Sequence, residues 1–81
     1  PTEERRRELV KNSSAMGEEA KISLRSIRQE HKKKIDLAKN EKTISEDIAK
    51  MHETNLQKSI DESIKEVDSL VKEKEEEIMK I

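Results

Sequence analysis

Residues 9–38 read LVKNSSAMGEEAKISLRSIRQEHKKKIDLA, and this stretch decides the fold. Apolar and small side chains recur in it at steps of four, three and four, so that the pattern repeats every 11 residues. We call this set the first stripe; it consists of Leu9, Ser13, Met16, Ala20, Leu24, Ile27, His31, Ile35 and Ala38. An 11-residue repeat corresponds to about 3.67 residues per turn, which predicts one long helix with nearly straight packing. Disordered charged sequence would not keep such a stripe.

Helix start signals occur at two places outside the stripe. Thr2 is followed by two glutamates, and Ser45 is followed by a glutamate and an aspartate. A hydroxyl side chain can cap the first turn of a helix, and the acids after it suit the positive end of the helix dipole. We therefore expect one domain over residues 1–81, with helices at about 3–39 and 46–80 and a turn at about 40–45.

A second apolar stripe runs along the later helix and is wider than the first. It consists of Ile48, Leu56, Ile60, Ile64, Val67, Leu70, Val71, Ile78 and Ile81. The short turn makes the two helices antiparallel neighbours, and a wide stripe can contact two neighbouring helices. The predicted fold is therefore all-α: a long antiparallel helical pair that forms part of a three-helix bundle. An isolated chain of this kind is expected to self-associate, as a dimer with four helices.

Composition excludes several classes of protein. The chain of 81 residues is 46% charged and 30% hydrophobic, and it contains no cysteine and no aromatic residue. Without cysteine there is neither a disulfide framework nor a thiolate metal site. No apolar run approaches the roughly 18 residues that a membrane span needs, so no membrane association is expected. The charge is uneven: residues 1–40 carry 11 basic and 7 acidic side chains, and residues 41–81 carry 7 and 12.

Basic side chains gather on one ridge of the first helix. Lys21, Arg25, Arg28 and Lys32 follow steps of four, three and four, and Arg7 extends the ridge toward the N-terminus. At 100° per residue the ridge lies roughly 100° round the helix from the first stripe, so we expect it to be exposed. Such a ridge could follow a nucleic-acid backbone through its phosphates. A solvated face of a lysine-rich helix would have the same pattern, and the residues leave both interpretations open.

The sequence gives no sign of catalysis, of a metal site or of a bound cofactor. His52-Glu53 matches the start of a zinc-protease signature, but Leu56 stands where the second histidine is required. His31 lies in the first stripe, where an interface histidine is the ordinary interpretation. Exposed helices offer no pocket that would shift the pKa of a carboxylate for acid–base work. We therefore expect a protein that is not an enzyme.

Several short motifs, in one order along the chain, resemble those of the ribosome recycling factors. The match covers the whole chain without a gap, and it includes Thr2–Leu9, Gly17–Lys21, Leu24–Arg28, Ile44–Asp47, Leu56–Lys58 and Ile64–Glu66, with Lys74-Glu75 and Ile78-Met79 near the end. Each motif alone is weak, and their ordered spacing carries the resemblance. By this resemblance the two helices are the second and third helices of a three-helix bundle, and the first helix and a small α/β domain are absent from this chain.

The resemblance implies a role in translation. Members of that family dock on the RNA of the large ribosomal subunit and, with elongation factor G, split the ribosome after termination. The RNA-facing positions fall on Arg25 and Arg28, with Lys21 in a similar position. Many relatives carry a basic residue where Gln29 stands, so one contact is in doubt. The implied location is the cytoplasm of a bacterium, or a plastid or mitochondrion.

Two other classes of function compete with this expectation. A structural coiled-coil or helical-hairpin interaction protein would use the ridge only for solubility. A DNA-binding helix pair of the basic-zipper type would need a sustained leucine heptad beside its basic residues, which this sequence lacks.

Overall fold

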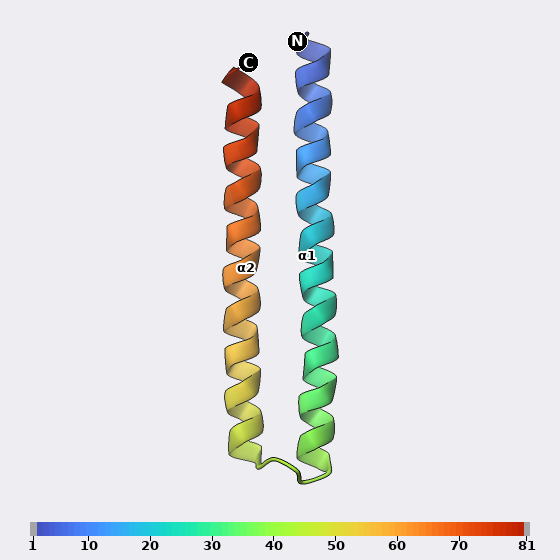
Figure 1. Cartoon of the computed structure of the whole chain (residues 1–81), viewed down its shortest axis with the longest axis vertical. Coiled ribbons are helices and arrows are strands. Elements are labelled where there is room, and N and C mark those ends of the chain that lie inside the picture. Colours follow the sequence, from blue (N-terminus) through green and yellow to red (C-terminus); the bar gives the residue numbers. More distant parts are fainter. Residues whose placement is uncertain (1, 81) are drawn as a thin grey trace.

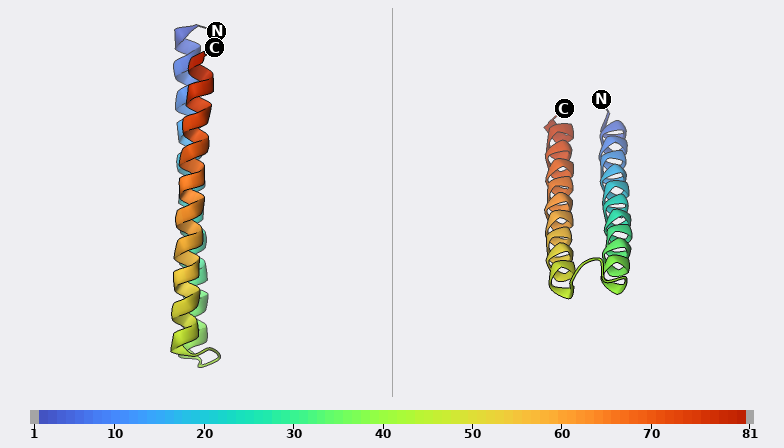
Figure 2. Two further views of the ribbon diagram at one scale, coloured as in Figure 1. Left: turned by 90° about the vertical axis from the view of Figure 1, so that its left-hand side faces the viewer. Right: turned by 60° about the horizontal axis from the view of Figure 1, so that its bottom comes forward.

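The computed structural model describes residues 2–80, and in this range the chain is a hairpin of two long helices (Figure 1). Helix α1 spans Glu3–Asn40 and helix α2 spans Glu46–Lys80, and neither the helices nor the turn between them contains a strand. The Cα atoms extend over 60 × 15 × 8 Å, and the helices stay side by side and nearly straight in all views (Figure 2). The prediction of an all-α antiparallel pair is confirmed. Ile81, the last member of the second stripe, lies outside the described residues.

Both helices begin at the expected caps. The Thr2 hydroxyl oxygen accepts a hydrogen bond from the backbone N–H of Arg5 at 3.2 Å. The Ser45 hydroxyl oxygen accepts one from the backbone N–H of Ile48 at 3.1 Å, and the Ser45 carbonyl accepts from Ala49 at 2.9 Å. These bonds satisfy backbone donors of the first turn that have no partner inside the helix.

Helix α1 ends at a backbone conformation that the sequence does not predict. Lys42 has a φ of 61°, in the left-handed region where glycine is usual. This conformation lets the backbone N–H of Thr43 donate to the Ala38 carbonyl at 2.9 Å, and the Thr43 hydroxyl donates to the same carbonyl at 3.1 Å. The carbonyls of Leu37, Ala38 and Lys39 thus accept hydrogen bonds without a glycine in the turn, and α1 ends one residue later than expected.

The contact between the helices follows the 11-residue period on both sides. On α1, Gly17 is buried, and Arg6 and Arg28, which lie 11 residues before and after it, are half-buried. On α2, Ala49 and Ile60 are buried and are also 11 residues apart. Residues at this spacing lie on one straight line along a helix, so the two helices can remain in contact over their whole length without coiling.

Helix α2 covers only one edge of the first stripe. Leu9, Ala20 and Leu24 are half-buried, whereas Met16 is 70% exposed and Ile27 is 48% exposed. An apolar groove of about 680 Å³ runs along this side. We call this side the apolar face; it comprises Leu9, Met16, Ala20, Leu24 and Ile27 of α1 and Val67, Leu70 and Ile78 of α2.

The helices approach most tightly at the glycine of α1. A Cβ atom placed on Gly17 would lie 2.5 Å from a methyl carbon of Val71, which is closer than such atoms can pack. Val71 is β-branched and has one strongly preferred rotamer in a helix, so it cannot easily turn aside. Gly17 therefore permits the close approach of α1 and α2 along their line of contact, which we call the seam. It does so despite the roughly 1 kcal/mol that glycine costs inside a helix.

Replacing Gly17 by alanine should destabilise the hairpin when residue 71 is valine and stabilise it when residue 71 is alanine. In the parent chain, overpacking of roughly 1–3 kcal/mol outweighs a propensity gain of about 1 kcal/mol, so Gly17→Ala should lower the free energy of unfolding. In a Val71→Ala background the methyl group that causes the clash is gone, and Gly17→Ala should raise the free energy of unfolding. Denaturant unfolding of the four chains at one protein concentration measures the cycle. A stabilising Gly17→Ala in the parent chain would contradict the close approach.

Removing the cap of α2 should weaken the hairpin. Ser45→Ala is expected to lower the free energy of unfolding by about 1 kcal/mol, because the N–H of Ile48 loses its acceptor. Ser45→Asp, which keeps an acceptor, should lose little, and Ser59→Ala on an exposed turn of the same helix is the matched control. Thermal unfolding followed by circular dichroism would reveal a misplaced cap if Ser45→Ala and Ser59→Ala behaved alike.

Candidate nucleic-acid interface

The basic residues lie on the side of the hairpin away from the apolar face. We call this side the basic face; on α1 it comprises Arg7, Lys21, Arg25, Arg28 and Lys32. Two of its lysines reach across to acids of α2, whereas Leu24 and Ile27 line a groove with Val67 and Leu70 on the other side. Helix α2 thus packs along a line between the first stripe and the basic ridge. The apolar side chains therefore lie on one side of the hairpin and the basic side chains on the other.

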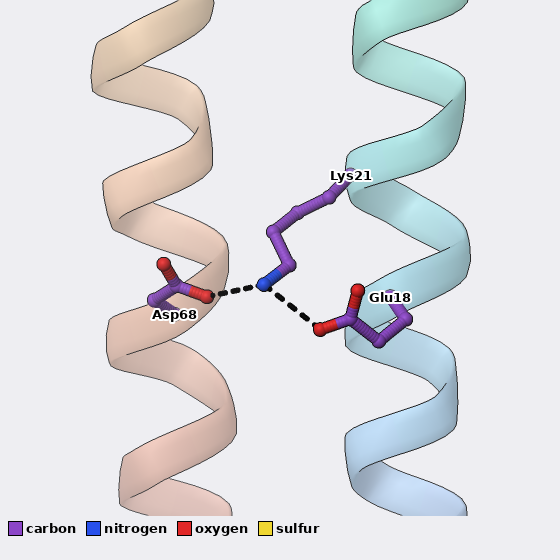
Figure 3. A network of polar contacts seen from close by, with 3 residues as sticks. All are labelled: Glu18, Lys21 and Asp68. Carbon is purple, nitrogen blue, oxygen red and sulfur yellow. Dashed lines mark hydrogen bonds and ion pairs between the residues drawn. The ribbon is translucent and has the colours of Figure 1, made fainter.

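Lys21 sits between two carboxylates, one from each helix (Figure 3). Its ammonium donates to Asp68 of α2 at 2.9 Å and lies 3.0 Å from Glu18 of α1. The hydrogen bond to Asp68, followed by the one to Glu18, raises the pKa of Lys21. Only 16% of the Lys21 side chain is exposed, because its stem lies along the seam and its charged end meets the acids.

Lys32 repeats this arrangement one 11-residue period later. Its ammonium donates to Glu53 of α2 at 2.8 Å and lies 3.7 Å from Asp36 of α1. The hydrogen bond between Lys32 and Glu53 raises the pKa of the lysine and lowers the pKa of the glutamate. Each group therefore favours the charged form of the other, although the Lys32 side chain remains 55% exposed.

The expectation of a fully exposed ridge is wrong for two of its members. Lys21 and Arg28 are half-buried, whereas Arg7, Arg25 and Lys32 are exposed. The ridge does lie about 100° from the first stripe, but α2 packs along the line between them and therefore covers the inner edge of both. Arg28 is 11 residues after Gly17 and therefore lies on the line along which the helices pack, which explains its partial burial.

The arginines and the lysines of the basic face differ in their partners. Within residues 2–80, Arg7, Arg25 and Arg28 form no ion pair, whereas both lysines are paired with acids. A guanidinium without a carboxylate partner keeps its planar set of donors available for phosphate oxygens. The arginines are therefore more available to phosphate oxygens than the lysines of the same face.

A polar groove of about 1050 Å³ opens beside Arg28, toward the turn. Helix α1 contributes Gln29 and Lys32 to it, and α2 contributes three acids, two lysines and the amide of Gln57 together with Thr54 and Leu56. Among these, the Gln57 amide donates to Asp61 at 2.9 Å, so this acid is engaged on its own helix. Sequence reasoning missed these α2 partners. Residues at similar distances from the turn of an antiparallel pair lie near each other. This rule would have matched Lys32, eight residues before the end of α1, with Glu53, seven residues after the start of α2. It would have placed Lys21 opposite a position three residues short of Asp68.

The described part of the chain gives no support for a metal site, for a paired-histidine site or for a membrane span. No group of three histidine, cysteine, aspartate or glutamate side chains within residues 2–80 is placed to hold a metal ion. The side chains of His31 and His52 are both exposed and belong to different helices. Over the same residues, neither helix is apolar enough over a sufficient length to cross a membrane.

Known proteins similar to this chain are ribosome recycling factors. A model of the family described as ribosome recycling factor matches residues 1–79. The chain is 48% identical over 81 residues to the ribosome-recycling factor of Stenotrophomonas maltophilia, covering all of this chain and 44% of that protein. It is 51% identical over 82 residues to that of Staphylococcus carnosus, and 45% identical over 80 residues to that of Brevibacillus brevis.

The chain spans less than half the length of these relatives, 43–44% of each. The family match nevertheless covers nearly every residue of the hairpin, including both caps and the whole basic face. The resemblance found in the sequence is therefore confirmed: the chain belongs to the ribosome recycling factor family.

Proposed function

We propose that the hairpin docks through its basic face on the ribosomal RNA of the large subunit. In this role it would serve the recycling of ribosomes after termination, together with elongation factor G. The observation that carries the proposal is the presence of three arginines without an ion pair on one side of the hairpin, within residues 2–80. The names of the relatives supply the ribosome as the partner.

The chemistry of the basic face favours recognition of the backbone over recognition of bases. The chain has no phenylalanine, tyrosine or tryptophan, so bases cannot stack on an aromatic ring. Arg25 is exposed and Arg28 borders the polar groove, which lets both guanidinium groups meet phosphates of one strand. Arg7, on the same side nearer the N-terminus, would extend the contact along the hairpin. The hairpin acts by docking and performs no catalysis.

The location proposed for the protein is the cytoplasm of a bacterium or the interior of a plastid or mitochondrion. The relatives compared above are all bacterial proteins, which supports the first of these locations.

A second candidate function is a structural helical hairpin that binds another helix through its apolar face. The exposure of Met16, Ile27 and Leu70 favours a helical partner on that side. In the complete factor the resemblance implies that the first helix of the bundle covers this face. The two functions are compatible, because the basic face stays open when the apolar face is covered.

The arginines should carry the docking energy. We expect Arg25→Ala and Arg28→Ala each to weaken binding to large ribosomal subunits by roughly 1–3 kcal/mol, with a shallower dependence of affinity on salt. Binding is measured with a chimera in which this chain replaces the matching segment of the Stenotrophomonas maltophilia factor. The chimera also shows whether this hairpin supports ribosome splitting.

The matched control is Lys34→Ala. Lys34 is exposed, carries the same charge on the same helix and, seven residues after Ile27, lies on the apolar side. It should bind like the parent. If Arg28→Ala also binds like the parent, the basic face is not the docking site. If Lys34→Ala loses as much affinity as Arg28→Ala, the attraction to RNA is a general effect of positive charge. The structural helical hairpin is then the better supported of the two functions.

The isolated chain should pair with a second copy through the apolar face. Two hairpins that join these faces would form a bundle of four helices and remove Met16, Ile27 and Leu70 from water. Sedimentation at micromolar concentration should show a dimer, and Leu70→Lys should shift it toward the monomer by placing a charge in the interface. Met79→Lys, at an exposed site lining a separate groove, should leave the dimer intact. A stable monomer of the parent chain would contradict this pairing.

A further inference from the structure

The two lysines of the basic face are held by acids of the opposite helix at almost identical distances. Lys21 donates to Asp68 at 2.9 Å, and Lys32 donates to Glu53 at 2.8 Å. Each lysine also lies near an acid of its own helix, so each forms a group of one positive and two negative side chains. These groups stand at both ends of the segment that contains Arg25 and Arg28.

We propose that Asp68 and Glu53 withhold Lys21 and Lys32 from the nucleic acid and confine phosphate binding to the arginines between them. This inference rests on the proposed docking of the basic face on RNA. The lysines are then positioning residues that join α1 to α2, and the acids set how many positive charges the face offers.

Competition for the ammonium group is the physical basis of the proposal. Lys21 meets two carboxylates within 3.0 Å, and its side chain is only 16% exposed. To reach a phosphate it would have to leave Asp68, and a phosphate that approached the intact group would meet a local charge of −1. Among residues 2–80, Arg25 and Arg28 form no ion pair, and of the acids that line the groove beside Arg28, Glu53 is paired with Lys32 and Asp61 is bonded to Gln57. A guanidinium fork can therefore accept a phosphate without breaking an ion pair.

The ion pairs reduce the number of basic side chains that the face offers to phosphates. Lys21 and Lys32 are 11 residues apart, which is about 16 Å along a helix. Were all four basic residues available, this length would offer four phosphate contacts, whereas the ion pairs leave two. Each contact removed lowers the number of counterions released on binding by about one. A factor that must leave the ribosome after each round benefits from such limited attraction.

Neutralising the acids tests the proposal. Asp68→Asn keeps the size of the side chain, removes the acid that holds Lys21 against α2 and leaves Glu18 as its remaining ion-pair partner, so that the local charge rises from −1 to 0. The chain should then bind large ribosomal subunits about fivefold more tightly at 0.15 M salt, with a salt dependence steeper by about one. Glu53→Gln should do the same through Lys32. In the Asp68→Asn chain, Lys21→Met should abolish the gain, because the ammonium that Asp68 held is then absent. Circular dichroism of each variant confirms that the helices remain.

Asp61→Asn is the matched control, because Asp61 belongs to the same helix and is bonded to Gln57 instead of a lysine. Its removal changes the net charge equally but releases no ammonium group, so binding should tighten far less. An equal gain from Asp61→Asn, or a gain from Asp68→Asn that persists when Lys21 is replaced by Met, would overturn the proposal. Failure of the docking function would look different: Arg25→Ala and Arg28→Ala would then bind like the parent in the same assay.

Discussion

The line along which α2 packs on α1 determines what each side of the hairpin can do. Gly17 lets the helices approach until a methyl group of Val71 fills the space of a side chain. Arg6 and Arg28 continue the same line at steps of 11 residues. Because this line runs between the apolar stripe and the basic ridge, neither set is fully covered. One interhelical contact thus produces a face suited to another helix and a face suited to phosphate.

Periodicity and capping residues were sufficient to predict the helices, their antiparallel arrangement and the turn. Thr2 and Ser45 cap helices as expected, because a hydroxyl before two acids is a local signal that needs no tertiary context. The closure of α1 at Lys42 could not be predicted, since a lysine in a left-handed conformation leaves no mark in the sequence. The partial burial of Lys21 was missed because it depends on the exact line of contact between the helices, which the stripe alone does not define.

The basic face illustrates how one helix can carry charge for two purposes. Its lysines, with flexible stems and compact charges, are tied to α2 and stabilise the pairing of the helices. Its arginines keep their planar donors open on the same side. The chain belongs to the ribosome recycling factor family, and the docking on RNA proposed above would use the extended surface that a hairpin about 60 Å long supplies. The apolar face, in turn, supplies the contact by which such a hairpin joins a larger bundle.

We propose that the basic face, and not the apolar face, is turned toward ribosomal RNA. The chain has no cysteine, so a single cysteine can carry a tethered source of hydroxyl radicals at a chosen site. Gln29 lines the polar groove beside Arg28, and Ser23 lines the apolar groove on the other side. With the chain bound to large subunits, a probe at position 29 should cleave the RNA strongly and one at position 23 weakly. Equal cleavage, or stronger cleavage from position 23, would contradict the account.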